Sequence, residues 1–192
     1  MTSNSWANGL VQTLKNPKSH IISSNLAVVI SDKYPKAKHH YLVLPLEEIH
    51  SIFNAAANKF NIFFSPQLNR QHIPLLQEMH LLALNIIEIK GEKQNNFKIG
   101  FHNQPSMHRL HLHVISKDFI SDCLKTKKHW NSFNTQLFLN YEDMLVQLEE
   151  TNQVKRLECA LIKELGNMDL KCNQCAFVAK NMPSLKQHLL EH

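Results

Sequence analysis

Two histidines, His111 and His113, are separated by one apolar residue in a segment where polar and apolar side chains alternate. Alternation over residues 109–116 predicts a half-buried strand that places Arg109, His111 and His113 on one face. A neutral imidazole is a good nucleophile whose charge changes near neutral pH. One ring could attack phosphorus while its neighbour donates a hydrogen bond to the phosphoryl oxygens. The alternatives are a His-x-His zinc pair and ordinary polar residues on a solvated sheet face.

The residues that precede this strand favour phosphoryl chemistry over the two alternatives. Ser106 ends a Gln-Pro-Ser turn, whose hydroxyl and main-chain N–H groups could hold a phosphate. His102 closes the preceding predicted strand, over residues 97–102. We therefore expect a site for phosphoryl transfer that is held on a rigid strand rather than on a loop.

Two cysteines and two histidines near the end of the chain have the spacing of a two-Cys two-His zinc finger: Cys172, Cys175, His188 and His192. The cysteines would contribute ligands from a tight turn, and the histidines at i and i+4 from one helix face. The aromatic residue usual four places after the second cysteine is Ala179, with Phe177 earlier. A single finger binds DNA weakly, so we interpret this module, with its structural zinc, as an auxiliary grip on DNA backbone.

The composition is that of a globular protein with one core and a small satellite domain. Of the 192 residues, 43% are apolar and 19% charged, and the net charge of +5 modestly favours polyanionic partners. No run of 18 apolar residues and no secretory layout at residues 1–8 is present, so we expect an intracellular protein without a membrane partner. Cys123 and Cys159 are interpreted as reduced thiols.

The patterns along the chain predict an α+β fold, with an antiparallel sheet and packed helices, followed by the zinc finger. Helices are expected over residues 6–14, 47–58, from 65 to near 91, and in the amphipathic stretch 141–165. Strands are expected over 25–31, 40–44, 97–102 and 109–116, the last two paired antiparallel. Residues 117–140 show no clear periodicity. The predicted domains are a catalytic domain over 1–140, a helical connector over 141–168 and the finger over 169–192.

Several segments carry a family resemblance that covers nearly the whole chain, from residue 6 to residue 192. The segments are Asp-Lys-Tyr-Pro-Lys-Ala at 32–37, His-Tyr-Leu-Val-Leu-Pro at 40–45, Pro-Ser-Met at 105–107 before the His-x-His strand, and Lys-Lys-His-Trp-Asn-Ser-Phe at 127–133. Together with the zinc finger, they resemble the aprataxin branch of the histidine triad (HIT) superfamily. The family's first triad histidine falls on Arg109, and the neighbouring His108 would point to the opposite strand face.

The resemblance implies a nuclear DNA repair hydrolase that removes AMP from 5′-adenylated DNA ends left by abortive ligation, without a catalytic metal. The middle histidine, His111, would be the nucleophile and form a covalent AMP-histidine intermediate. The resemblance also assigns contacts with the substrate: His113, His102 and Ser106 to the phosphoryl oxygens, His40 and Lys128 to the same pocket, Asp32 to the ribose, and Trp6 and Leu10 to the DNA end and adenine.

Simpler roles and other functions stay open at this point. Trp6 could be a core aromatic, and Asp32 could form the turn in which it lies. One alternative function is a general hydrolase of nucleoside phosphoramidates or diadenosine polyphosphates. Another is a non-catalytic zinc-finger DNA-binding module on a degenerate scaffold, for which Arg109 is the best argument. The sequence leaves open whether RNA-DNA junctions are substrates and which repair proteins are partners.

Overall fold

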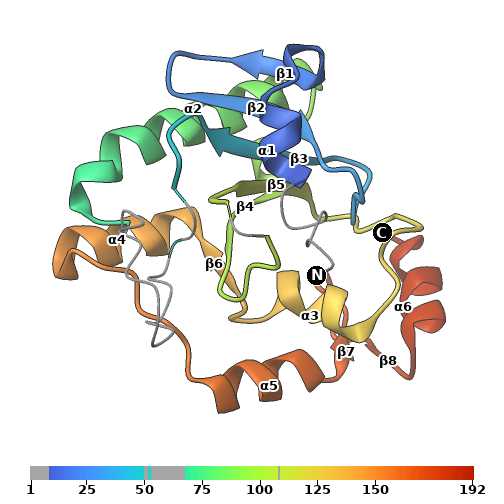
Figure 1. Cartoon of the computed structure of the whole chain (residues 1–192). Coiled ribbons are helices and arrows are strands. Elements are labelled where there is room, and N and C mark those ends of the chain that lie inside the picture. Colours follow the sequence, from blue (N-terminus) through green and yellow to red (C-terminus); the bar gives the residue numbers. More distant parts are fainter. Residues whose placement is uncertain (1–8, 50–51, 53–67, 108) are drawn as a thin grey trace, which may run out of the picture.

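A six-stranded antiparallel sheet forms the centre of the computed structural model, which describes residues 9–49, 52, 68–107 and 109–192 (Figure 1). The strand order is β1-β2-β3-β5-β4-β6. The strands are β1 (His20–Ser23), β2 (Ala27–Ser31), β3 (His40–Pro45), β4 (Phe97–His102), β5 (Leu112–Ser116) and β6 (Phe138–Asn140). The predicted α+β fold with an antiparallel sheet and packed helices is confirmed.

Six α-helices surround or follow this sheet in the described part of the chain. They are α1 (Gly9–Leu14), α2 (Ile73–Ile89), α3 (Lys127–Asn134), α4 (Tyr141–Thr151), α5 (Cys159–Asn167) and α6 (Met182–Leu189). Short 3₁₀ helices cover Pro17–Ser19, Arg70–His72 and Gln94–Asn96. None of the described helices is long and apolar enough to cross a bilayer.

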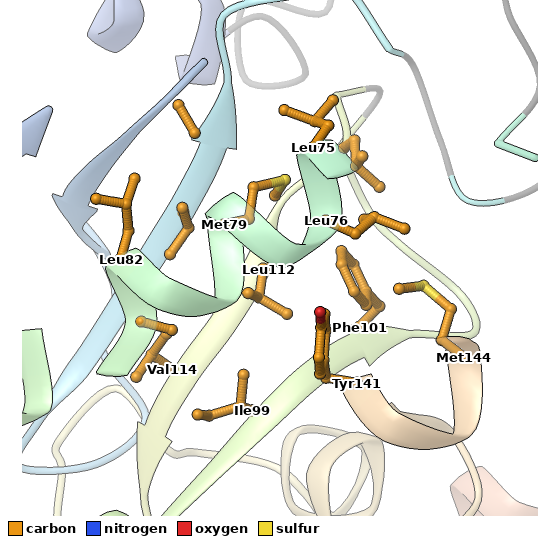
Figure 2. Packing of buried hydrophobic residues seen from close by; sticks show 14 of the residues in the cluster. Leu75, Leu76, Met79, Leu82, Ile99, Phe101, Leu112, Val114, Tyr141 and Met144 are labelled. Carbon is orange, nitrogen blue, oxygen red and sulfur yellow. The ribbon is translucent and has the colours of Figure 1, made fainter. Parts of the chain in front are cut away.

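The main hydrophobic core lies between one face of the sheet and helices α2 and α4. Figure 2 shows Leu76 and Met79 of α2 above Leu112 and Val114 of β5. Because successive side chains of a strand point to opposite faces, burial of Leu112 and Val114 under α2 turns His113 to the other face. This packing orients the histidine strand.

The opposite face of the sheet carries the histidines and two smaller apolar clusters. The α1 cluster consists of Leu10, Val28, Ile30, Leu42 and Leu44. The finger cluster joins β5, β6, α3 and the zinc finger through Ala37, Ile115, Phe119, Leu124, Trp130, Phe133, Phe138, Leu170, Cys172, Ala179, Met182, Leu185 and Leu189. The finger therefore shares a core with the rest of the chain.

The zinc finger consists of a short hairpin and one helix. Strands β7 (Leu170–Lys171) and β8 (Val178–Ala179) pair antiparallel and precede α6. Asn181 caps α6 by accepting the N–H of Ser184 at 2.9 Å. Trp130 of α3 donates its indole N–H to the carbonyl of Lys171 at 3.0 Å, which joins α3 to this hairpin.

Several predicted boundaries differ from the structure. The first residues of the helix expected from residue 65 lie outside the described part of the chain, and from residue 68 onward the α-helix begins at Ile73 as α2. The stretch 141–165 is divided into α4 and α5 because Asn152 adopts a left-handed conformation, with φ of 59°. Strand β1 and helix α3 were not predicted. A signal for α3 was Thr126, whose side chain caps the helix by accepting the N–H of His129. The helix predicted over 47–58 lies largely outside the described residues.

Candidate active site

Four histidines form one cluster on the open face of the sheet, in which His40, His111 and His113 are buried and His102 is half-buried. His40 comes from β3, His113 from β5 and His102 from β4, while His111 lies directly before β5. The ring centroid of His113 lies 4.4 Å from that of His102, 4.8 Å from that of His111 and 5.2 Å from that of His40. The strand order therefore brings together all four histidines that the sequence assigns to the site.

A chain of hydrogen bonds fixes the proton of His113. Lys36 donates its main-chain N–H to Nδ1 of His40, 3.1 Å away. Because a main-chain amide only donates, the proton of a neutral His40 lies on Nε2. That Nε2 lies 3.0 Å from Nδ1 of His113, so the proton of His113 lies on its own Nε2. Asp32 is 3.6 Å from His40 Nδ1, too far to compete as a hydrogen-bond acceptor.

His111 and His102 have the opposite tautomer. Nδ1 of His111 lies 2.6 Å from the carbonyl oxygen of Arg109, and Nδ1 of His102 lies 3.1 Å from that of Ser132. A carbonyl oxygen only accepts, so each Nδ1 carries the proton and each Nε2 a lone pair. Nε2 of His113 is buried and has no hydrogen-bond partner among the described residues. The site thus combines a nucleophilic lone pair on His111 with an unused N–H donor on His113.

Burial keeps these rings neutral. It lowers the pKa of His40 to about 4, against the opposing effect of Asp32, and lowers the pKa of His102 to about 3. Burial also lowers the pKa of His111, and it places the pKa of His113 well below the usual value. The Lys36 ammonium acts in the same direction on His102 and His113. A neutral imidazole is the form that attacks phosphorus.

Helix α3 supplies contacts that the sequence pattern did not reveal. The main-chain carbonyl of Ser132 holds His102. The ring of Phe133 stands edge-on to His40, His102 and His113, with centroid separations of 5.5, 4.5 and 5.5 Å. This apolar ring covers part of the cluster, which strengthens the electrostatic interactions that the imidazoles make.

Arg109 departs from its predicted place. The strand predicted over 109–116 begins only at Leu112, so the expectation that residues 109–111 belong to it is wrong. Nη2 of Arg109 instead donates to three consecutive main-chain carbonyls at 2.9, 3.0 and 3.0 Å, those of Pro45, Leu46 and Glu47. Bonds to this segment replace strand pairing before Leu112. Arg109 nevertheless lines a small cavity together with His102 and His111.

The other predicted substrate residues lie at different distances from the cluster. Ser106 is exposed, and its neighbour Pro105 lines the small cavity with His102 and His111. Asp32 approaches His40 and also accepts the N–H of Tyr34 at 2.7 Å, as a turn-forming residue does.

The two remaining elements assigned to the substrate are α1 and the start of α3. Leu10 of α1 is buried in the α1 cluster, and Met107, from the loop before His111, packs against it. Lys128 is exposed on the first turn of α3. Trp6 lies outside the described residues.

Among the described residues, the donor group that could hold a metal ion on this face does not include His111 of the zinc-pair alternative. Donor atoms of Asp32, His40 and His113 do lie within 4.8 Å of one another. However, the Lys36 N–H occupies Nδ1 of His40, and the proton on Nε2 leaves no lone pair towards His113. A metal ion would have to break this hydrogen-bond chain to bind.

Four residues of the finger hold a structural zinc ion: Cys172, Cys175, His188 and His192. Their donor atoms lie within 4.8 Å of one another, and two thiolates with two imidazoles are a preferred donor set for zinc. Glu191 lies 3.3 Å from Nδ1 of His188 and orients its ring. Phe177 stacks on His188, with centroids 4.1 Å apart. The sequence predicted that His192 lies on the helix, but α6 ends at Leu189 and His192 lies beyond it.

Two protein families match adjoining parts of the chain. Residues 5–129 match the family described as scavenger mRNA decapping enzyme C-term binding. Residues 134–192 match the C2HE / C2H2 / C2HC zinc-binding finger. The aprataxin ortholog Hnt3 of Schizosaccharomyces pombe has a similar fold, with a TM-score of 0.72 at 24% identity over 97% of this chain and 94% of that one.

Aprataxin-like proteins match nearly the whole chain in sequence. One from Drosophila melanogaster is 55% identical over 188 residues, which cover 98% of this chain and 26% of the relative. One from Saccharomyces cerevisiae is 32% identical over 179 residues, which cover 84% of this chain and 81% of the relative. The chain spans only 55% and 53% of the lengths of the chicken and zebrafish aprataxins. By sequence and fold, the chain belongs to the aprataxin family.

Proposed function

We propose that this chain is a DNA repair hydrolase that removes AMP from 5′-adenylated DNA ends. The observation that carries the proposal is the pair of opposite tautomers, a lone pair on His111 beside an unused N–H on His113. Nucleophilic transfer to phosphorus needs this combination, because negative charge develops on the phosphoryl oxygens while the new bond forms. Membership of the aprataxin family supports the choice of an adenylated substrate.

The first step transfers AMP to the protein. Nε2 of His111 attacks the adenylate phosphorus and forms an N–P bond, while the P–O bond to the DNA 5′-phosphate breaks and its electron pair leaves with the DNA. The second pKa of a phosphate monoester is about 6, so this leaving group needs little protonation. His111 keeps its Nδ1–H, and the carbonyl of Arg109 accepts it, which stabilises the positive charge of the AMP-imidazolium.

The second step returns the site to its starting state. Water attacks the phosphorus, and the N–P bond breaks with its electron pair returning to Nε2 of His111, which becomes neutral again. One proton of the attacking water stays on the departing AMP, and the other passes to solvent. His113 donates its Nε2–H to a phosphoryl oxygen in both steps. His102 takes up a proton when the anionic substrate arrives, because a nearby negative charge raises the pKa of an imidazole, and it then donates as well. We assign no catalytic metal to these steps.

The proposal places the remaining substrate contacts around this cluster. Ser106 and the Lys36 ammonium contact phosphate oxygens, and Lys128 contacts the phosphate side of the pocket. Asp32 accepts hydrogen bonds from the ribose. Leu10, through α1, and the preceding Trp6 support the adenine and the DNA end. We retain 1–140, 141–168 and 169–192 as the proposed catalytic, connector and finger domains.

DNA is the proposed macromolecular partner. Hnt3 was solved in complex with DNA, and also with DNA and guanosine. The net charge of +5 on this chain favours a polyanion. The zinc finger acts as an auxiliary grip on the backbone, RNA-DNA junctions are a second proposed substrate class, and the proposed location is the nucleus.

Three labelled substrates separate this function from its alternatives: a 5′-adenylated nicked duplex, an AMP-amine phosphoramidate and a diadenosine polyphosphate. We expect release of AMP and a 5′-phosphate end, with kcat/KM on the nicked duplex at least about tenfold above the other two, or about 1.4 kcal/mol. Equal kcat/KM values on all three would indicate a general nucleotide hydrolase. Tight binding of the duplex without turnover would indicate a non-catalytic DNA-binding module.

A further inference from the structure

The Arg109 guanidinium is buried at the end of β3, where it donates hydrogen bonds to three main-chain carbonyls. Arg109 is 8% exposed. Its Nη2 lies 2.9 Å from the carbonyl oxygen of Pro45 and 3.0 Å from those of Leu46 and Glu47. Hydrogen bonds from a charged donor are about twice as strong as neutral ones, so this contact ties residue 109 firmly to the segment 45–47.

The main chain that follows Arg109 is tied to the same segment. The N–H of Leu110 donates to the carbonyl of Ile49 at 2.8 Å. The carbonyl of Arg109, on the other side of the same peptide group, accepts the Nδ1–H of His111 at 2.6 Å. The planar peptide group between Arg109 and Leu110, whose carbonyl binds His111, is therefore fixed from two sides: by the N–H of Leu110 and by the side chain of Arg109.

We propose that Arg109 is a positioning residue, whose guanidinium holds the peptide carbonyl that fixes the tautomer and direction of His111. The inference rests on the proposed function for the role of His111 as nucleophile. The hydrogen-bond geometry also allows the inference to be tested in the free protein, without substrate. If the carbonyl shifts, the Nδ1–H of His111 loses its acceptor and the ring proton redistributes between the two nitrogens.

The donor count explains why an arginine suits this position. A neutral histidine has one N–H donor, whereas Nη2 of Arg109 alone has two, and these are shared among the three carbonyls. A lysine ammonium carries a charge and three donors, so it can replace much of this contact. Methionine fills similar space but donates nothing, and it leaves the three carbonyls without this charged partner.

The test compares Arg109→Met with Arg109→Lys by NMR and by kinetics. Two-bond 1H–15N correlation spectra of the free protein report which nitrogen of His111 carries the proton. We expect one tautomer in the wild type and in Arg109→Lys, and a mixture in Arg109→Met. On the AMP-amine phosphoramidate, kcat of Arg109→Met should fall by up to about a hundredfold, as for a displacement of about 1 Å, with little change in KM.

Arg70→Met is the matched control, because Arg70 donates to the main-chain carbonyl of Glu149 on the protein surface. It should leave both readouts unchanged. If the His111 spectrum of Arg109→Met matches that of the wild type, the inference is overturned. A fall in stability or turnover alone would not rescue it, because loss of a residue with a purely structural role would also lower stability or turnover without changing the tautomer. If Arg109→Met does not fold, loss of the single tautomer in Arg109→Gln supports the inference and its retention overturns it. If His111 of the wild type shows a mixture of tautomers and the wild type does not turn over the substrate, the result would count against the proposed function instead.

Discussion

Nε2 of His40 lies 3.0 Å from Nδ1 of His113 and holds the proton of His113 on Nε2, the nitrogen that has no hydrogen-bond partner among the described residues. His40→Leu removes this donor, so the His113 proton is free to move to Nδ1 and the phosphoryl oxygens lose a partner. We expect kcat on the AMP-amine substrate to fall about 10- to 100-fold, as for an unsatisfied buried polar group of about 1–3 kcal/mol.

His40→Gln is the matched variant, because its side-chain amide can also donate towards His113. It should lose less of kcat than His40→Leu. If both variants turn over the AMP-amine substrate at the wild-type rate, the chain from Lys36 through His40 to His113 does not set the donor.

The buried histidines should make stability depend on pH in the acid range. An unfolded histidine has a pKa of about 6.5, whereas burial lowers the pKa to about 4 for His40 and about 3 for His102. The contribution of these two rings to the free energy of unfolding is complete above the unfolded pKa. It is lost as the pH falls towards the folded pKa, because only the unfolded chain takes up these protons. The free energy of unfolding should fall by up to about 1.4 kcal/mol per pH unit for each ring.

Urea unfolding of the wild type and His102→Gln between pH 7.5 and pH 4.5 measures this slope. Loss of zinc at low pH affects both proteins, so the difference between them reports His102. The His102→Gln curve should be flatter with pH by up to the contribution of one ring. Parallel curves would show that His102 does not stay neutral in the folded protein.

Zinc removal should affect the histidine site as well as DNA binding. Trp130 and Asn131 of α3 donate to the carbonyls of Lys171 and Met168 at 3.0 and 2.9 Å, while the next residue, Ser132, holds His102. Much of the folding free energy of a zinc finger comes from its metal. We expect Cys175→Ser to lower turnover of the small AMP-amine substrate about tenfold or more, as for loss of at least 1.4 kcal/mol of positioning.

Lys186→Ala is the control for that experiment, since Lys186 makes an ion pair with Asp122 at 3.8 Å on the surface of the finger. Such exposed pairs contribute little to stability, so turnover of the AMP-amine should stay at the wild-type level. Full activity of Cys175→Ser on the small substrate, with loss only on DNA, would mean that the shared core does not position α3.

The lysines around the start of α3 should contribute to the salt dependence of DNA binding. Lys125 and Lys128 are both exposed. Changing both to Ala should reduce the log-log slope of duplex affinity against salt by about 0.9 for each phosphate that the protein no longer neutralises. Lys90→Ala, at the end of α2 on the opposite face of the sheet, should leave the slope unchanged. An equal change in both variants would place the DNA elsewhere.

The sequence predicted the histidine face from β5 onward because alternation there reflects packing. Leu112 and Val114 are buried under α2, and that burial orients His113. Strand order is a long-range property, however, so the pattern alone could not show that His40 and His102 would lie on either side of His113. For that part, the family resemblance was needed.

Residues 109–111 and helix α3 could not be predicted from the sequence, because tertiary contacts determine their conformation. Alternation continues through residues 109–111, but Arg109 binds carbonyls beyond β3, and strand pairing begins only at Leu112. In α3, Trp130 contacts the finger while Phe133 contacts the histidines. Trp130 and Phe133 lie three residues apart on one face of α3, but two apolar residues in this short helix are too few to establish a helical period in the sequence.

Covalent capture of AMP tests the central claim most directly. Nicked DNA that carries labelled AMP on its 5′ end is mixed with the protein, quenched in base within one turnover, and the labelled peptide is identified by mass spectrometry. We predict AMP on the ring of His111 in the wild type and no labelled peptide in His111→Ala, which should lose nearly all turnover. Label on another residue, or turnover by His111→Ala within about tenfold of the wild type, would contradict the assignment of His111 as the nucleophile.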